Sequence, residues 1–242
     1  MKTVIYKRIK IMANKFAKMF IAGGLKVPDR IPKKETFKAF NSFSVPKELI
    51  CKSYNTPVEN QGNLPYCAAY AASSFAENIL WRKRHYPVEI DPVPLYKYAK
   101  TIDGDPNGGG TFLECTMEAL LVKDYFDKDL CKIKQIGGAS IFGNSGAIRD
   151  VQFAIHRYGI CMAGFDITDE WFNPKGNWIR DDKVYRSAGG HAVCIVGWNE
   201  KGFLILNSWG KQYAEDGYVW ITYDAFLRRF IYATTMTHVL DD

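Results

Sequence analysis

The sequence lacks a hydrophobic run long enough to cross a bilayer. Its longest apolar stretches, Ala192–Trp198 and Phe203–Leu206, fall far short of the roughly 20 residues that a membrane helix needs. It also lacks internal repeats and low-complexity tracts. Of its 242 residues, 47% are hydrophobic and 14% aromatic, which is ample for a packed core. We therefore expect a soluble, folded chain without a transmembrane segment.

Cysteine is also scarce, and its spacing is uninformative about metals. Six cysteines are too few for a disulfide scaffold in a chain of this length, and no CxxC pair offers a zinc site. The even number permits bridges without arguing for them. We expect neither a metal nor an organic cofactor.

Acidic residues are nearly missing from the first 45 residues. This stretch holds 11 of the 32 Lys+Arg but only two of the 26 Asp+Glu, so it carries +9 and the remainder −3. Such an arm suits contact with nucleic acid, an anionic surface or an acidic partner, and a solvated leader fits equally well. Lys10, Lys15 and Lys18 interrupt the apolar core that a secretory signal requires, whereas a transit-type leader stays open.

Prolines mark where the globular body begins. Pro28, Pro32 and Pro46 punctuate a charged stretch that is typical of an extended linker. We therefore divide the chain into a basic arm or pro-segment at 1–45 and a folded body at 46–242. The strongest loop signal within the body is the Asp103–Gly110 stretch, DGDPNGGG.

Helical patterns dominate the first half of the body and strand patterns the second. Helices are predicted over Cys67–Arg84, Phe112–Tyr125 and Gly146–Tyr158 from their apolar spacing. Strands are predicted from β-branched and aromatic runs over His191–Trp198, Phe203–Asn207 and Tyr218–Tyr223. This segregation predicts an α+β protein with a helical half packed on an antiparallel half.

Cys67 is the first candidate for chemistry. It begins a predicted helix, where free amide N–H groups and the macrodipole stabilise an anion, so we expect its thiol to ionise more easily than an ordinary one. A thiolate attacks a carbonyl far better than a thiol does. Taken alone, however, a cysteine in an alanine-rich helix is more often a small buried hydrophobe.

Two residues downstream supply the remaining parts of a nucleophilic site. A hairpin that turns near Glu200–Lys201 brings the start of its first strand and the end of its second to one edge, so His191 and Asn207 become neighbours. An Asn side chain can accept the imidazole N–H and leave the other ring nitrogen for the thiol. Cys67, His191 and Asn207 therefore form a candidate triad.

At these positions the chain resembles the papain family of cysteine peptidases. The resemblance rests on VENQGNLPYCAAYAASSF at 58–75, GGHAVCIVGW at 189–198 and FLILNSWGKQYAEDGYVWI at 203–221. The order Cys, His, Asn is that of the family, and the Cys-to-His interval of 124 is slightly below the usual roughly 130–150. The resemblance implies a two-lobed fold, with a helical lobe at about 46–145, a β lobe at about 146–242 and a cleft between them.

The resemblance also implies roles for residues around the triad. Gln61 corresponds to the glutamine whose side-chain amide helps to hold the tetrahedral oxygen, and Trp209 to the indole that covers the Asn–His hydrogen bond. Gly108 and Gly109 resemble the loop that pairs with an extended peptide, although the third glycine, Gly110, allows a shift of one residue. We assign Gly108, Gly109 and Trp209 to substrate binding.

The chain departs from the family pattern beside the nucleophile. Leu64 occupies the place of a cysteine that is normally disulfide-bonded, and its partner position corresponds to Pro106. Loss of both halves of that bridge fits a reducing compartment, so we expect an intracellular protein. Pro65, Tyr66 and Ala68 replace the residues usually found next to the thiol, which would alter substrate preference.

The resulting prediction is a cysteine-type peptidase that hydrolyses peptides or proteins through a Cys67 acyl-enzyme. Acyl transfer other than hydrolysis and a catalytically silent peptide-binding or structural module, anchored by the basic arm, remain alternatives. Residues 1–45 occupy the place of a pro-segment. We hypothesise that Val27–Phe43 lies along or beside the active-site cleft, so a zymogen that removes its own arm stays open.

Overall fold

A computed structural model describes residues 24–26, 39, 42, 44–125, 131–136, 145–183 and 185–238. Its elements fall into a helical group, a sheet, and two helices on the far side of the sheet. In chain order they are β1 (Leu49–Ile50), the short 3-10 helix η2 (Lys52–Tyr54), α2 (Cys67–Arg84), α3 (Pro92–Ile102), α4 (Leu113–Val122), β2 (Cys131–Ile136), α5 (Ser145–Tyr158), β3 (Cys161–Thr168), η3 (Asp169–Phe172), β4 (Trp178–Ile179), β5 (Ser187–Trp198), β6 (Gly202–Leu206), β7 (Tyr218–Thr222), α6 (Tyr223–Arg229) and β8 (Phe230–His238).

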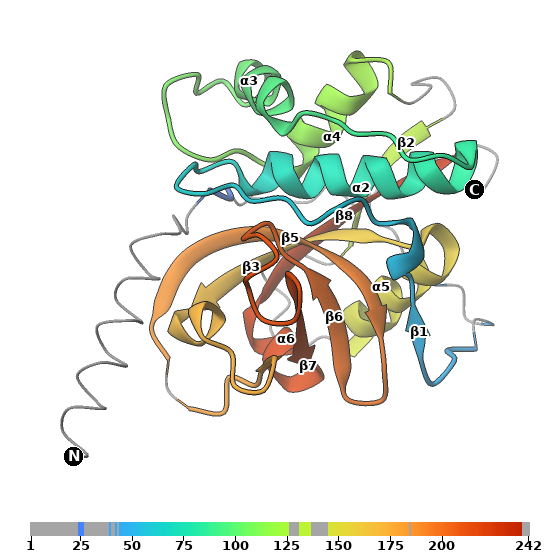
Figure 1. Ribbon diagram of the computed structural model, residues 1–242, viewed down its shortest axis with the longest axis vertical. Helices are drawn as coiled ribbons and strands as arrows, with labels where there is room; N and C mark the ends of the chain where they lie inside the picture. Colours follow the sequence, from blue (N-terminus) through green and yellow to red (C-terminus); the bar gives the residue numbers. More distant parts are fainter. Residues whose placement is uncertain are drawn as a thin grey trace.

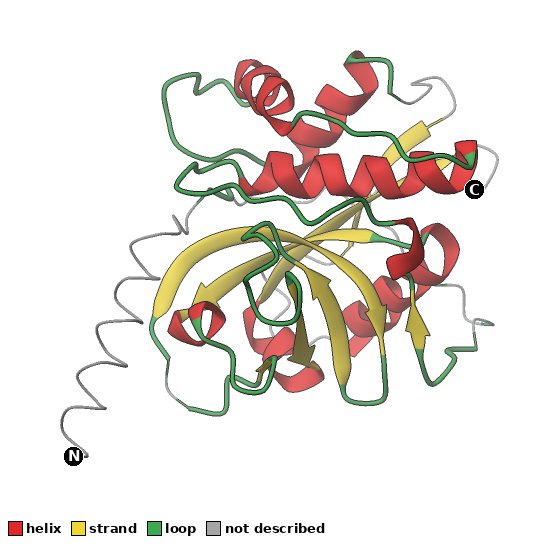
Figure 2. Ribbon diagram, in the orientation of Figure 1, coloured by secondary structure: helices red, strands yellow, loops and turns green. Residues whose placement is uncertain are grey.

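The strands form one curved sheet with the order β2-β8-β3-β5-β6-β7-β4, and β1 pairs with β5 outside that path. All pairs are antiparallel except β4 with β7, which are parallel. Figure 1 shows α2 crossing between the sheet on one side and α3 and α4 on the other. Figure 2 shows that loops connect these layers.

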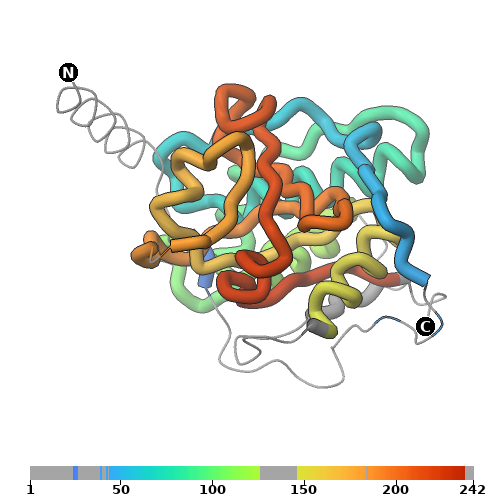
Figure 3. Tube along the Cα trace, turned by 90° about the horizontal axis from the view of Figure 1, so that it is seen from below, coloured from blue at the N-terminus to red at the C-terminus, as the bar shows by residue number. Residues whose placement is uncertain are grey.

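The sheet separates two apolar cores because successive side chains of a strand point to opposite faces. In β5, Ala192 and Cys194 belong to the core under α2, whereas Val193 and Ile195 belong to the core shared with α5 and α6. This double burial explains why the β5 sequence reads as a nearly continuous apolar run. In the view from below, the second half of the chain lies in front and the α3–α4 region behind (Figure 3).

Helix α2 is buried along most of its length because small side chains cover its surface. Ala68, Ala69 and Ala72 are completely buried, and the helix contacts α3, α4 and β5. Small residues let these neighbours approach the helix backbone closely. The tight packing holds the first residue of α2, Cys67, against the sheet.

The sequence predicted the class of fold and several elements correctly. The α+β architecture is confirmed, as are α2 with its bounds and, within a few residues, α4, α5, β5, β6 and β7. The domain division at 45/46 and the lobe boundary near 145 stay predictions. Two strands from the range assigned to the helical lobe, β1 and β2, pair with strands of the sheet.

Candidate active site

The first residue of α2 places the Cys67 sulfur at the junction of the helix and the sheet. No side chain caps this helix terminus, so its first amide groups remain available. The backbone N–H groups of Cys67, Ala68 and Ala192 all act on the sulfur. Ala192 directly follows His191 in β5, so the sulfur lies beside the residue next to the predicted histidine.

The hairpin of β5 and β6 brings His191 and Asn207 together, as the sequence predicted. Trp198 pairs with Phe203 across the turn, and His191 Nε2 lies 2.9 Å from Asn207 Oδ1 at the other end. His191 is completely buried and Asn207 nearly so. The two-strand register therefore sets the position of the imidazole ring.

A second hydrogen bond determines which imidazole nitrogen carries the proton. The backbone N–H of Ser208 donates to Asn207 Oδ1 at 2.8 Å, so the oxygen of the amide faces both neighbours. Since that oxygen can only accept, His191 Nε2 must donate to it. In the neutral ring the lone pair then belongs to Nδ1, which is buried and has no hydrogen-bond partner among the described residues.

Trp209 covers this histidine within an aromatic cluster. Its ring centroid lies 4.8 Å from that of His191, and it stacks on Phe172 at 5.3 Å. Trp209 is completely buried, so its side chain excludes water from the His191–Asn207 pair rather than presenting a surface to solvent. Burial of this kind strengthens the electrostatic interaction between the two side chains.

Gln61 is held close to the same region by two contacts with Ser208. The backbone N–H of Gln61 donates to Ser208 O at 2.9 Å, and Ser208 Oγ donates to Gln61 Oε1 at 2.6 Å. These contacts orient the amide so that Nε2 donates to Leu64 O at 2.9 Å. One of the two Nε2 hydrogens remains for another acceptor.

A three-residue stretch of the N-terminal arm, Gly24–Lys26, lies over the sulfur, and we call it the interlobe segment. A methyl group built on Gly24 would lie 2.9 Å from Cys67 Sγ and 2.7 Å from Pro65 O. The Leu25 side chain fills the space above Gly164, where an added methyl group would meet Leu25 Cδ2 at 2.4 Å. Leu25 is only 6% exposed, so the segment is part of the packed structure.

Backbone hydrogen bonds tie the interlobe segment to the glycine loop that precedes α4. Thr111 N donates to Gly24 O at 3.0 Å, and Lys26 N donates to Thr111 O at 2.9 Å. Gly110 has a positive φ of 69°, and a methyl group on it would meet Gly24 O at 2.5 Å. Glycine is required at this approach because a side chain would displace the segment.

The pairing with the interlobe segment falls one or two residues after Gly108 and Gly109, whose role in substrate binding stays a prediction. Gly108 packs on Asp105 and Gly109 faces Pro65, whereas Gly110 and Thr111 contact the extended segment. The hypothesis that Val27–Phe43 lies along the cleft falls largely outside the described residues. Within that range, the backbone N–H of Ala39 donates a hydrogen bond to Asp150 Oδ1 of α5 at 2.8 Å.

Burial changes the ionisation of the predicted pair. Burial raises the pKa of the Cys67 thiol to about 11, although backbone N–H groups of Ala192, Ala68 and Cys67 pull in the other direction. Burial also lowers the pKa of His191 to about 4, against the hydrogen bond to Asn207. The prediction of an easily ionised Cys67 thiol is wrong for the structure described here. Desolvation of the sulfur raises its pKa by more than the backbone N–H groups lower it.

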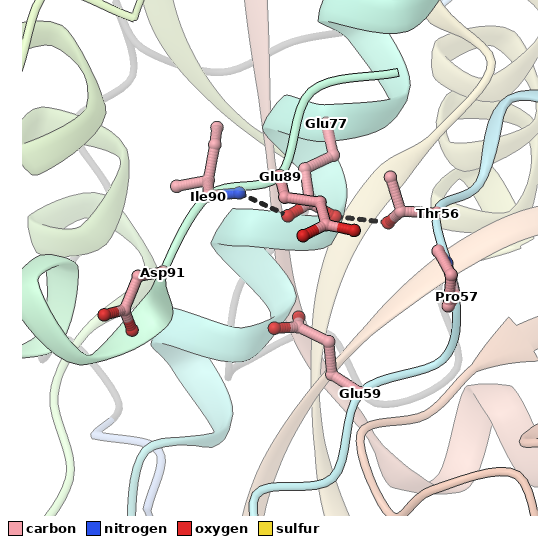
Figure 4. Close-up of a pocket in the computed structure, with 7 residues that line it drawn as sticks. All are labelled: Thr56, Pro57, Glu59, Glu77, Glu89, Ile90 and Asp91. Carbon is pink, nitrogen blue, oxygen red and sulfur yellow. Dashed lines mark hydrogen bonds between the residues drawn. The ribbon is translucent and has the colours of Figure 1, made fainter.

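A separate cavity of about 460 Å³ lies where the chain from Thr56 to Glu59 passes α2 and the start of α3. Figure 4 shows Glu77 bonded to Thr56 and the Ile90 N–H, with Glu59, Glu89 and Asp91 around it. Burial, and then the charge of Glu77, raises the pKa of Glu59 to about 7. Glu59 O accepts from Gly210 N at 2.9 Å, so the cavity adjoins the loop that carries Trp209.

Across the described part of the chain, no three His, Cys, Asp or Glu side chains are grouped to hold a metal ion. Within the same residues, no helix combines the length and apolarity needed to span a membrane. The five cysteines whose side chains are described, Cys51, Cys67, Cys115, Cys161 and Cys194, are free thiols.

Comparisons with known proteins define the class of fold. The solved structure of xylellain, a cysteine protease from Xylella fastidiosa, superposes with a TM-score of 0.73 over 91% of this chain and 98% of its own, at 17% identity. A digestive procathepsin L 3 from Tenebrio molitor larval midgut gives a TM-score of 0.68 over 93% of this chain and 79% of its own, at 16% identity. The protein thus has the two-lobed papain-like α+β fold.

Sequence comparisons find similarity to the same class of proteins. Residues 124–232 match the model of the papain family cysteine proteases, a range that includes His191 and Asn207 but not Cys67. Mouse cathepsin S is 21% identical over 222 residues, covering 81% of this chain and 64% of its own. The cathepsin B-like cysteine proteinase 6 of Caenorhabditis elegans is 27% identical over 129 residues, covering 52% and 34%.

The matched part of this chain spans about a third of the full length of that C. elegans relative. The chain thus has the fold of the papain-like cysteine proteases and resembles them in sequence over the range that carries His191 and Asn207.

Proposed function

We propose that the protein is a cysteine peptidase that hydrolyses peptide bonds through a thioester on Cys67. The observation that carries this proposal is the 2.9 Å contact between His191 Nε2 and Asn207 Oδ1, which leaves Nδ1 as the proton acceptor. The sulfur lies beside Ala192, the next residue along β5. Base and orienting amide thus come from one hairpin, and the nucleophile comes from a motif 124 residues before His191.

The reaction would begin once the interlobe segment leaves the sulfur. Exposure to water removes the desolvation that raises the pKa of Cys67 and lowers that of His191, so proton transfer from sulfur to Nδ1 becomes easier. The thiolate attacks the scissile carbonyl, and His191 then donates its proton to the departing amine. His191 next accepts a proton from water, which attacks the thioester and frees the acid.

Gln61 and the Cys67 N–H would stabilise the tetrahedral oxygen. The Gln61 amide is fixed through its Oε1 by Ser208, and one Nε2 hydrogen is not used by Leu64 O. A preoriented donor of this kind is worth roughly 2.7–4 kcal/mol in acyl transfer. Substrate would be an extended peptide that replaces the interlobe segment beside Gly110 and Thr111.

The test uses two cysteine variants with a fluorogenic peptide panel and a thiol-directed epoxide. Wild type should turn over a peptide and acquire one label on Cys67, and Cys67→Ala should lose both. Cys51→Ala is the matched control, because Cys51 is more exposed than Cys67 and is free. Activity that survives in Cys67→Ala overturns the proposal, and labelling without turnover of any peptide would favour a silent binding module.

A further inference from the structure

A cation from the chain's own arm is bound next to the candidate active site. Lys26 Nζ lies 2.8 Å from Asp105 Oδ2 and 3.2 Å from Asp103 Oδ2. The same ammonium group lies 5.8 Å from the centre of the Phe112 ring. Two carboxylates and an aromatic face on one amine are a recurrent way of recognising a cationic side chain.

The two carboxylates are held in place independently of Lys26. The Asp103 side chain is fully buried and lies 2.8 Å from Lys100 Nζ, which also donates to Gly110 O at 3.0 Å. Asp105 N donates to Asp103 Oδ1 at 2.9 Å, and Gly108 N donates to Asp105 Oδ1 at 3.0 Å. The cluster is therefore preorganised before a cation arrives.

The charges of this cluster do not balance without an incoming cation. Lys100 is nearly buried and supplies one positive charge against the negative charges of Asp103 and Asp105. The remaining negative charge faces Lys26, whose side chain is 23% exposed and comes from a segment 77 residues away. A displaced Lys26 would leave the site open to another cation.

The interlobe segment also shows how many residues of an extended chain separate this site from the sulfur. Gly24 lies over Cys67, Leu25 fills the space above Gly164 and beside Gly190, and Lys26 reaches the carboxylates. Its extended backbone pairs with Thr111 on both sides of Leu25. The cation therefore sits two residues from the position next to the sulfur, beyond an aliphatic side chain.

We infer that Asp103, Asp105 and Phe112 form a cation-binding subsite. The subsite selects peptides in which Lys or Arg lies two residues from the residue at the sulfur, with an aliphatic residue between the two. This inference rests on the proposed function, because it names the substrate class of the same site. In the covered arrangement Lys26 occupies the subsite, so a suitable substrate competes with the interlobe segment for it.

The experiment measures how peptides protect Cys67 from alkylation by iodoacetamide, which needs binding but no turnover. The full chain with Lys26→Gln serves as background, since its own segment no longer supplies the cation. Blocked tripeptides containing Lys-Leu-Gly and the reversed Gly-Leu-Lys are compared with partners in which norleucine replaces Lys. Asp105→Asn tests the subsite because its side chain can still accept from Gly108 N, and Glu200→Gln, in the β5–β6 turn, controls for loss of a negative charge.

We expect a lysine peptide to protect Cys67 at about three- to tenfold lower concentration than its norleucine partner in at least one of the two orders. Asp105→Asn should erase that difference, whereas Glu200→Gln should preserve it. Equal protection by lysine and norleucine peptides in both orders, or an unchanged preference in Asp105→Asn, overturns the subsite. Failure of wild type to turn over any peptide concerns the proposed function alone, because protection is read without catalysis.

Discussion

Asn207 Oδ1 accepts hydrogen bonds from both His191 and the Ser208 backbone, so this single atom sets the tautomer and the plane of the imidazole. Asn207→Ala removes the acceptor and frees the ring. We expect the kcat for peptide hydrolysis to fall by about 10–100-fold, by analogy with the loss seen when a partner that orients a metal-ligating histidine is removed. Steady-state kinetics with the best peptide of the panel gives this value.

The conservative variant Asn207→Asp separates orientation from packing. Its carboxylate retains an acceptor for His191 Nε2 and for the Ser208 N–H, so it should keep more activity than Asn207→Ala. Equal loss of activity in the two variants would contradict the assigned role of Oδ1, provided that both unfold at the same denaturant concentration as wild type.

Gly24 is the residue that brings the interlobe segment onto the sulfur. A Cβ at this position would approach Cys67 Sγ and the Pro65 carbonyl within 2.9 Å, a distance that real Cβ atoms essentially never show. Gly24→Ala should therefore push the segment away and expose the thiol. We expect alkylation of Cys67 at pH 7.5 to become at least several times faster than in wild type.

The measurement is peptide mapping by mass spectrometry after a timed reaction with iodoacetamide. Cys51 provides an internal reference in the same molecule. It lies in another part of the chain from Gly24, so it should be labelled equally in both proteins. An unchanged ratio of Cys67 to Cys51 labelling would mean that the segment does not limit access to the sulfur.

At the scale of elements, α2 depends on residues that are small rather than strongly apolar. Ala72 is completely buried in a helix that contacts α3, α4 and β5. Ala72→Leu overfills this packing and should lower the free energy of unfolding by about 1–3 kcal/mol. Lys83→Leu on the exposed side of the same helix is the control, and denaturant unfolding of both variants should show a loss only for Ala72→Leu.

The elements that the sequence predicted best are those with local signals. The apolar spacing over Cys67–Arg84 indicated α2, and the turn near Glu200–Lys201 indicated the β5–β6 hairpin. The hairpin alone was enough to predict that His191 meets Asn207. The position of Cys67 relative to these two residues could not be predicted in the same way, because it depends on how α2 packs on the sheet.

Helix α3 was missed although its start carries a recognisable signal. Asp91 accepts from Val93 N, and Pro92 occupies the first turn, where its missing N–H costs nothing. No element was predicted for this range from the sequence, so this cap was overlooked. Strand β3 was missed as well, because the pairing with β5 and β8 that stabilises it is non-local.

At the scale of the whole molecule, the interlobe segment could not be predicted from the sequence. Leu25 pairs with Thr111, and Lys26 reaches Asp103, across more than 70 intervening residues. A leucine and a lysine in a basic arm carry no local signal for such contacts. The acidic residues of DGDPNGGG, adjoining a glycine loop, were the accessible hint of a charged site.

The acidic cavity beside α2 makes the stability of the whole fold depend on pH. Burial first, and then the charge of Glu77, raises the pKa of Glu59 from 4.5 to about 7. Between these values the folded protein holds a proton that the unfolded chain releases. This contribution to the free energy of unfolding therefore declines as pH rises from about 4.5 to 7, by an amount on the order of 1–2 kcal/mol once partial exposure is allowed for.

Glu59→Gln removes this proton and isolates its effect. Because burial lowers the pKa of His191 to about 4, that residue acts in the opposite sense, so the relevant quantity is the difference between wild type and variant. We expect Glu59→Gln to gain stability relative to wild type on going from pH 5 to pH 8 in denaturant unfolding. Glu200→Gln, at an exposed turn, should show no such gain, and an equal response of the two variants would contradict the buried charge.

The claim on which the account depends is that Cys67 carries the acyl group of a cleaved peptide, and its most direct test is the mass of the trapped intermediate. Wild type mixed with a peptide ester and quenched in acid should gain the mass of one acyl group, located by fragmentation on Cys67 and missing in Cys67→Ala. An acyl group on any other residue, or ester and peptide cleavage that persists in Cys67→Ala, would contradict the account.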